Sequence, residues 1–247
     1  MPPNAIDITP MENVTTHKVN VVDNMEPVKE EKTLSSVLKA INILVHLLIG
    51  MVVGVTVIFS LRLNSGPTQQ HVLMCTIGYQ LLMAQSILSL SPHNSWTAHL
   101  GLKTKRRVHW ILQLGGAALV IAGSILISLS KSVNWNTLHG KFGLVALVFT
   151  TVSLVNGLAS LYAYELRRIL PGILSKLTHI CFGTVAFTTA CVSLAYGFDK
   201  MSFRGWSSPE IAQGMVALTG ILNIMVIVSP LLVFSDKFVG AVRSKFS

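Results

Sequence analysis

The sequence contains little charge. Only 12% of its 247 residues are charged and 51% are hydrophobic, whereas about 25% of an ordinary soluble domain is charged. The mean hydropathy is +0.61. A soluble fold of this length would need more polar surface than these residues offer. The composition therefore excludes a soluble globular protein and predicts an integral membrane protein.

A polar nucleic-acid-binding segment is also absent. The net charge of +9 and the isoelectric point of about 9.7 would suit such a partner. However, no basic segment interleaved with aromatic residues stands apart from the apolar runs. Nucleic acid is therefore not expected as a partner.

Cysteine motifs and nucleotide-binding loops are missing as well. Cys75, Cys181 and Cys191 lie inside apolar runs and show no CxxC or CxxCH spacing. This argues against a disulfide scaffold, a zinc ribbon and covalent c-type haem attachment. No G-x-G-x-x-G follows a strand pattern and no P-loop is present, so no bound dinucleotide is expected.

The chain is instead rich in long apolar runs. A helix crosses a hydrocarbon core of roughly 30 Å with about 20 apolar residues. Six stretches are long enough, approximately 37–61, 71–91, 108–130, 139–163, 175–198 and 211–234. We predict an all-α membrane protein, a six-transmembrane-helix bundle, whose connecting loops are too short to hold a soluble catalytic domain.

Two terminal segments flank the apolar runs. Residues 1–35 carry six of the ten acidic residues and few large apolar groups, a composition that cannot bury enough surface to fold. We predict a disordered cytoplasmic tail at 1–35, a six-helix domain at 36–236 and a short cytoplasmic tail at 237–247. The first apolar run follows an acidic stretch, which is not the pattern of a cleaved signal peptide.

The basic residues predict the orientation in the membrane. With six spans, both termini share one side with the 92–107 and 164–174 loops, and fourteen of the 19 Lys and Arg residues lie there. The five others are Arg62, Lys131, Lys141, Lys200 and Arg204. Cytoplasmic loops carry the excess of Lys and Arg. We therefore predict that both termini are cytoplasmic.

Four of the eight histidines have ordinary explanations. His17 lies in the predicted tail, and His93 and His99 lie in the first cytoplasmic loop, where water or lipid headgroups surround them. His46 lies within the first span. We interpret it as a neutral imidazole bonded to a neighbouring helix.

The other four histidines form a pattern. His71, His109, His139 and His179 each lie in the first turns of spans two to five. Consecutive spans run in opposite directions, so His71 and His139 share the non-cytoplasmic depth and His109 and His179 the cytoplasmic one. Two histidines at one depth on two helices can bind one metal from opposite sides.

Glycines accompany these histidines on the same helix faces. Gly143 and Gly183 follow His139 and His179 by four residues, and Gly78 and Gly116 follow His71 and His109 by seven. A face that combines an imidazole with a missing side chain has room for a flat macrocycle. Close helix–helix packing would explain the glycines equally well.

Two imidazoles in apolar surroundings favour haem b over zinc. Zinc usually takes four protein ligands, and the acids outside the tail lie at loops or span edges, namely Glu165, Asp199, Glu210 and Asp236. Haem b supplies four equatorial nitrogens, so two axial imidazoles complete an octahedron. Filled axial positions favour electron transfer over oxygen activation. We expect two noncovalent b haems, one near each membrane surface.

Four segments of the chain match a known family. They are HVLMCTIGYQLLMAQSILSLSP from His71, KTKRRVHWILQL around His109, LHGKFGLVAL around His139 and KLTHICFGTVA around His179. Over about 37–235 the chain resembles the transmembrane cytochrome b561 family. Ascorbate-using members differ at two places: they carry an ALLVYR-like run where this chain has SILSLSP, and an SLHSW-like element where it has NWNTLHG.

The resemblance implies a fold and an activity. Four central helices would hold the two haems, with His71 and His139 ligating the non-cytoplasmic one and His109 and His179 the cytoplasmic one. Members act as transmembrane reductases, often as homodimers, that take electrons from cytoplasmic ascorbate. They deliver these electrons to monodehydroascorbate or ferric iron on the other side. The expected location is an endomembrane, of the endoplasmic reticulum or a vesicle, rather than the plasma membrane.

A basic cluster precedes the third span and is a candidate substrate site. Lys103, Lys105, Arg106 and Arg107 end two residues before His109, where cationic donors would steer an anion such as ascorbate. The positive-inside rule and anionic lipid would explain the same cluster. On the other side, Lys141 is a candidate partner for a haem propionate, or a snorkelling lysine.

Two other classes of function compete with the reductase. A small transporter could relay protons through intramembrane histidines, but these histidines gather at two depths with an apolar middle between them. A scaffold that binds haem without turnover is the other alternative.

Overall fold

The computed structural model describes residues 25–162 and 171–246. Contacts divide the chain into residues 1–37 and residues 38–247. The elements, in chain order, are α1 (Met25–Ser60), α2 (Pro67–Cys75), the π-helix η2 (Thr76–Met83), α3 (Ala84–Ser89), α4 (Leu102–Leu129), α5 (Leu138–Leu161), α6 (Gly172–Phe198), α7 (Met201–Trp206) and α8 (Pro209–Phe246). The described residues contain no β-strand.

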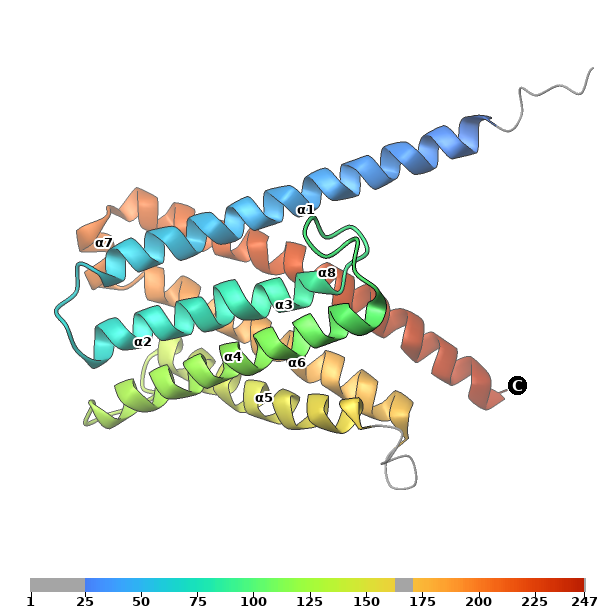
Figure 1. The fold of residues 1–247 in the computed structure, drawn as a ribbon. Coiled ribbons are helices and arrows are strands. Elements are labelled where there is room, and N and C mark those ends of the chain that lie inside the picture. The colour runs from blue at the N-terminus through green and yellow to red at the C-terminus, as the bar shows by residue number, and fades with distance from the viewer. Residues whose placement is uncertain (1–24, 163–170, 247) are drawn as a thin grey trace, which may run out of the picture. The chain divides into compact units, whose positions relative to one another are not determined.

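Within the described ranges, six helices are long and apolar enough to cross a membrane (Figure 1). They are α1, the continuous helix α2–η2–α3 over Pro67–Ser89, α4, α5, α6 and α8. The predicted all-α, six-span architecture is confirmed. The short helix α7, which the sequence analysis did not predict, links α6 to α8.

The helices that carry the four central histidines begin earlier than the apolar runs suggest. Pro67 opens α2, where its fixed φ favours a first helical turn. Thr137 caps α5 by accepting a hydrogen bond from the Gly140 amide at 3.1 Å. The basic run before His109 is helical from Leu102, because Lys and Arg are good helix formers.

The two outer helices extend into the predicted tails. Residues 25–35 belong to α1, and residues 237–246 continue α8, so these parts of the predicted disordered and C-terminal tails are helical. In α8, the Phe234 and Phe238 rings stack at 6.1 Å. Residues 1–24 lie outside the described residues.

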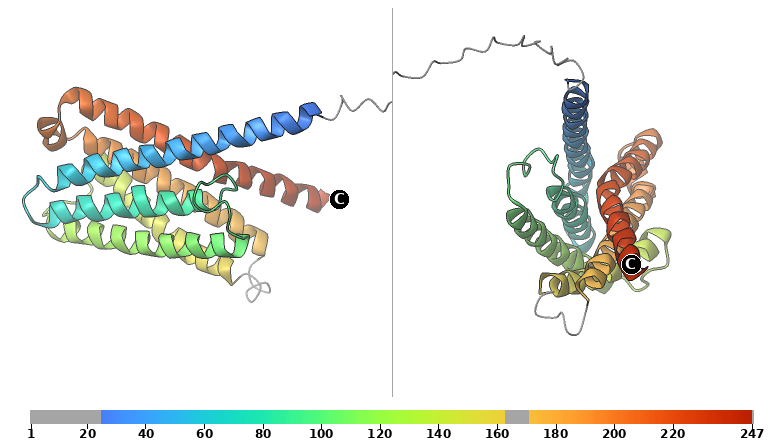
Figure 2. Two further views of the ribbon diagram at one scale, coloured as in Figure 1. Left: turned by 45° about the horizontal axis from the view of Figure 1, so that its top comes forward. Right: turned by 90° about the vertical axis from the view of Figure 1, so that its right-hand side faces the viewer.

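The histidine-bearing spans form two hairpins. The α2–η2–α3 helix packs against α4, and α5 packs along α6 (Figures 1 and 2). Helix α8 lies against α6. A buried apolar cluster includes Val45 and Val52 of α1 and Leu222 and Val226 of α8.

Buried polar side chains connect the hairpins between the two histidine depths. The Tyr79 hydroxyl lies 3.1 Å from Thr150 Oγ1. Gln80 Nε2 donates to Cys191 Sγ at 3.5 Å, while Gln80 Oε1 is buried without a partner among the described residues. The sequence analysis expected an apolar interior between the two histidine depths, whereas the structure places polar side chains there. These side chains carry uncharged amide, hydroxyl and thiol groups.

Candidate haem sites

The structure brings the four central histidines together in two pairs. The ring centroids of His71 and His139 lie 6.0 Å apart, and those of His109 and His179 lie 6.2 Å apart. Their planes cross at 88° and 87°. These are the pairs that alternating span direction predicts, and each joins one hairpin to the other.

Each of the four rings is held through its Nδ1 atom by a backbone carbonyl. The acceptors lie on the neighbouring helix of the same hairpin, at 3.1 Å (His71 to Gly123), 3.0 Å (His109 to Ser86), 2.8 Å (His139 to Ser193) and 3.1 Å (His179 to Ser153). A carbonyl oxygen only accepts hydrogen bonds, so Nδ1 carries the proton. The unprotonated Nε2 is then the free ligand atom, and its ring orientation is fixed.

The donor set fits a haem iron. The described residues contain no group of three or more His, Cys, Asp or Glu side chains able to hold a metal, so two imidazoles face each other without further protein ligands. An iron bound by both Nε2 atoms at about 2 Å would separate the ring centroids by about 6 Å, as is observed. The equatorial positions would be filled by a porphyrin.

A cavity of about 330 Å³ adjoins the His71–His139 pair. Both histidines line it together with Gly140, Gly143 and Gly197, none of which has a side chain to fill the space. It continues past the Trp135 loop toward Lys131 and Lys200. The His71–His139 pair therefore has open space beside it, as a bound macrocycle requires.

Comparison with known proteins agrees with this geometry. The family model of eukaryotic cytochrome b561 matches residues 70–204, which include both histidine pairs. The chain belongs to the cytochrome b561 family. Transmembrane reductase CYB561D2 of Mus musculus is 28% identical over 64% of this chain and 72% of its own length. The human protein of that name is 28% identical over the same shares.

A second mouse relative is also similar to the chain. Probable transmembrane reductase CYB561D1 of Mus musculus is 26% identical over 72% of this chain and 79% of its own length. No solved structure matches the chain. The chain is thus a multi-pass transmembrane oxidoreductase of the cytochrome b561 family, whose members bind haem b.

A regular spacing along the chain underlies the hydrogen bonds of the four histidines. Helices α4, α5 and α6 each contain one histidine and, 14 residues later, a residue whose carbonyl accepts a hydrogen bond from a histidine of the neighbouring helix. These pairs on one helix are His109–Gly123, His139–Ser153 and His179–Ser193. In the second span, His71 precedes Ser86 by 15 residues. That span alone among the described ones contains a π-helix, Thr76–Met83. In an α-helix, one extra residue would turn the following side chains by about 100°. The wider turns of the π-helix accommodate the extra residue, so that His71 and Ser86 face the same neighbouring helix.

Small residues against the histidine rings were missed by the sequence analysis. A Cβ atom on Gly157 would lie 2.9 Å from His179 Cε1, and one on Gly197 would lie 3.4 Å from His139 Nδ1. The hydroxyl of Ser86 also approaches His109 Nδ1, at 2.9 Å. The 14-residue spacing from His109, His139 and His179 to a Gly or Ser was the sequence signal that could have revealed three of the four carbonyl partners.

The four glycines singled out in the sequence have different roles. A Cβ on Gly78 would lie 2.9 Å from the Gly116 carbonyl oxygen, so these two glycines allow close packing of η2 on α4. Gly143 lines the cavity. A Cβ on Gly143 or Gly183 would lie 3.3 Å from the hydroxyl of Ser193 or Ser153 respectively.

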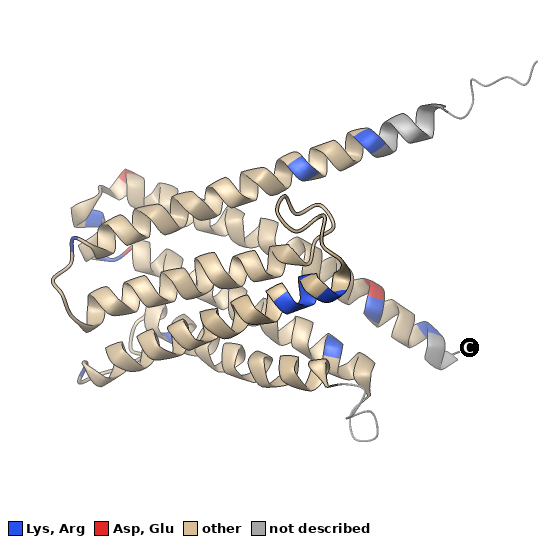
Figure 3. Cartoon of the chain, in the orientation of Figure 1, with Lys and Arg blue, Asp and Glu red and all other residues tan. Residues whose placement is uncertain are grey.

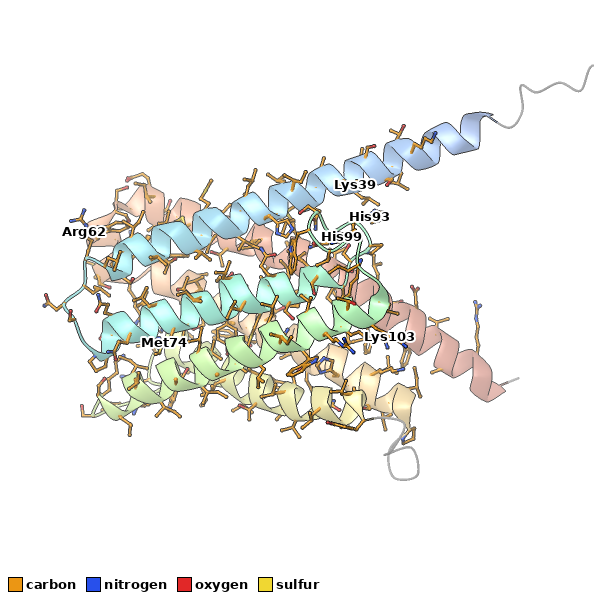
Figure 4. All side chains as sticks on the ribbon, viewed as in Figure 1. Lys39, Arg62, Met74, His93, His99 and Lys103 are labelled. Carbon is orange, nitrogen blue, oxygen red and sulfur yellow. The ribbon has the colours of Figure 1, made fainter. Side chains whose placement is uncertain are left out.

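The basic cluster before His109 divides into one buried and three exposed side chains. Lys105 is 7% exposed, and its Nζ donates to the Ser91 carbonyl at 2.9 Å. It lies four residues before His109, on the same face of α4. Lys103, Arg106 and Arg107 are exposed; the cluster is visible at the start of α4 in Figure 3, and Figure 4 labels Lys103.

His46 forms part of a network that organises the loop between α3 and α4. Its Nδ1 lies 2.9 Å from Gln85 Nε2, and its Nε2 lies 3.4 Å from Asn94 Nδ2. The Asn94 side-chain oxygen accepts from the amides of Trp96 and Thr97. The interpretation of His46 as an imidazole bonded to a neighbouring helix is confirmed. Figure 4 labels His93 and His99 on this loop.

Proposed function

We propose that the chain moves electrons across a membrane through two b haems, from cytoplasmic ascorbate to monodehydroascorbate or ferric iron on the opposite side. The observation that carries this proposal is the pair of facing imidazoles near each end of the four-span core. In both pairs the Nδ1 atoms are bonded to carbonyls, so that both Nε2 atoms are available as ligands.

The residues divide the work between the two membrane faces. His71 and His139 would hold the haem on the non-cytoplasmic side, and His109 and His179 the haem on the cytoplasmic side. Haem b with two axial imidazoles supplies reversible one-electron chemistry. The carbonyl bonds to Nδ1 fix the rings in place, and the surrounding apolar helices exclude water.

Lys105 is the residue that best fits a donor site. Its ammonium group is buried and bonded to one carbonyl, and a buried charge is costly unless an anion accompanies it. It lies one turn from His109, at the side where the donor would arrive. Lys103, Arg106 and Arg107 are exposed and would steer the anion from a distance.

The remaining assignments follow from the charge distribution and from the relatives. Both termini would be cytoplasmic, because most of the basic residues lie on that side. Residues 36–236 would form the reductase domain, in an endomembrane rather than the plasma membrane. A homodimer in membrane lipid is the expected assembly.

Transport of electrons through reconstituted vesicles tests the proposal. Proteoliposomes loaded with ascorbate should reduce an external ferric chelate, whereas empty liposomes should not. A proton-relay transporter would acidify the lumen without reducing the chelate, and a silent scaffold would do neither. Either of the last two results would overturn the proposal.

Histidine variants provide the matched control for the pairing. His109→Ala and His179→Ala should each remove the same haem, and the remaining haem should still be reduced by dithionite. His46→Ala, which alters an imidazole outside both pairs, should retain two haems per chain. Equal loss of both haems in either paired variant would refute the assignment.

A further inference from the structure

Two lysines lie at the mouth of the cavity beside His71 and His139. Lys131 follows α4 and Lys200 links α6 to α7, and both line the cavity that contains the two imidazoles. Two loops that are far apart in sequence thus bring two cations to one entrance.

Neither ammonium group has an anionic partner in the part of the chain that the structure describes. The nearby carboxylate, Asp199, is bound to Arg204 at 3.1 Å. Burial and the positive charge of Lys131 lower the pKa of Lys200. Two cations facing one cavity without a counterion repel each other, and this arrangement favours an anion between them.

The entrance is also shaped by an unusual backbone. Trp135 has a φ of 59°, which is rare for a bulky residue. Its loop lines the cavity, and its Cα packs against the first turn of α5, 3.1 Å from where a Cβ on Gly140 would lie. A strained backbone of this kind persists only where the surrounding structure holds it in place.

We propose that Lys131 and Lys200 bind the two propionate carboxylates of the haem held by His71 and His139. This inference rests on the proposed di-haem function. The propionates are the anionic groups of haem b, and both are carried on one edge of its ring. Lys141, which the sequence analysis considered for this role, does not line the cavity.

The reduction potential of this haem tests the assignment. In the His109→Ala background, where only the His71–His139 haem remains, Lys131→Gln and Lys200→Gln should each lower the equilibrium constant for reduction about threefold to tenfold. For a one-electron couple this corresponds to about 30 to 60 mV. Removing a positive charge favours the ferric form, so the shift is downward. Lys141→Gln, on the same side but outside the cavity, is the control and should leave the potential unchanged.

Esterified haem separates the propionates from other anions. Apoprotein reconstituted with haem b dimethyl ester should differ in potential from protein with haem b. In the Lys131→Gln/Lys200→Gln variant this difference should largely disappear, which is the non-additivity expected of contacting groups. The Lys131→Arg/Lys200→Arg variant, which keeps both charges, should restore most of the difference.

Three results would contradict the proposal in distinguishable ways. If the wild-type chain binds no haem, the proposed function fails first. If two haems bind but the lysine variants keep the wild-type potential, the proposed function stands and this inference is wrong. If the lysine variants keep that potential but need more acceptor for half-maximal rate, the two lysines bind the acceptor instead.

Discussion

At the residue scale, the geometry of the candidate haem sites depends on small groups beside the histidine rings as well as on the histidines. Gly157 leaves no side chain where the His179 ring lies, and a Cβ there would be 2.9 Å from Cε1. The corresponding distance at Gly197 is 3.4 Å from His139 Nδ1. A single methyl group added to a packed interior is destabilising where no space is available. Substitution by alanine should therefore be less tolerated at Gly157 than at Gly197.

We predict a graded response to three Gly→Ala substitutions. Gly157→Ala should lower occupancy of the His109–His179 haem at least threefold, because the ring must move or the helices must separate. Gly197→Ala should change the other haem only slightly, and Gly220→Ala, with no neighbouring atom within 4 Å, should change neither. Haem content and low-spin spectra measure this. Full occupancy in Gly157→Ala would contradict the packing argument.

Lys105 and Lys103 lie two residues apart but differ in burial, which makes them a matched pair. Lys105→Gln should raise the ascorbate concentration needed for half-maximal haem reduction at least tenfold. This effect corresponds to a lost charge-assisted hydrogen bond. Lys103→Gln should have a smaller effect that vanishes at high salt, since an exposed charge is screened. Stopped-flow reduction at two ionic strengths measures both. Unchanged reduction kinetics in both variants would assign the cluster to membrane topology alone.

At the element scale, the π-helix Thr76–Met83 accounts for the one irregular spacing. His71 and Ser86 are 15 residues apart in the second span, against 14 for His139 and Ser153 in the fourth. Deleting Leu81 from the π-helix should convert it to an α-helix and turn the His71 side chain away from its partner. We expect the His71–His139 haem to be lost while the His109–His179 haem remains.

A deletion outside the helix controls for shortening the chain. Removing Asn64, from the connection between α1 and α2, changes no spacing between His71 and Ser86 and should preserve both haems. Spectral titration after purification distinguishes the two variants. Two haems with unchanged spectra in the Leu81 deletion would show that the π-helix has no role in the register.

The sequence predicts the existence and order of the spans better than their internal geometry. Apolar runs of span length and alternating direction were sufficient to pair His71 with His139, because a membrane restricts spanning chains to simple topologies. The π-helix could not be predicted, because no residue type specifies it. The extra residue in the second span becomes evident only when its 15-residue spacing is compared with the 14-residue spacing of the other spans. Lys105 is buried and Lys103 is exposed because the two residues lie on different faces of α4. Which face is buried could not be predicted, since α4 begins at Leu102, before the apolar run.

At the scale of the whole molecule, the proposed function requires the two histidine pairs to lie near opposite sides of the membrane. Of the residues that the structure describes, α4 begins with the basic cluster at the His109–His179 end, whereas Lys131 and Lys200 lie at the His71–His139 end (Figure 3). An excess of positive charge retains a segment in the cytoplasm. The cluster end should therefore be cytoplasmic.

Cysteine labelling in sealed vesicles tests this orientation. Ala98 and Ser132 are both exposed, in the loops that follow α3 and α4 respectively. In vesicles whose cytoplasmic face is outward, a membrane-impermeant maleimide should label Ala98→Cys at once and Ser132→Cys only after detergent is added. The native cysteines lie within spans: Cys191 is buried, Cys75 is half-buried, and Cys181 is exposed but lies inside α6. The labelling of the parent chain is therefore measured as the background for both variants. Labelling of Ser132→Cys without detergent would reverse the orientation, and the donor side would then be the His71–His139 end.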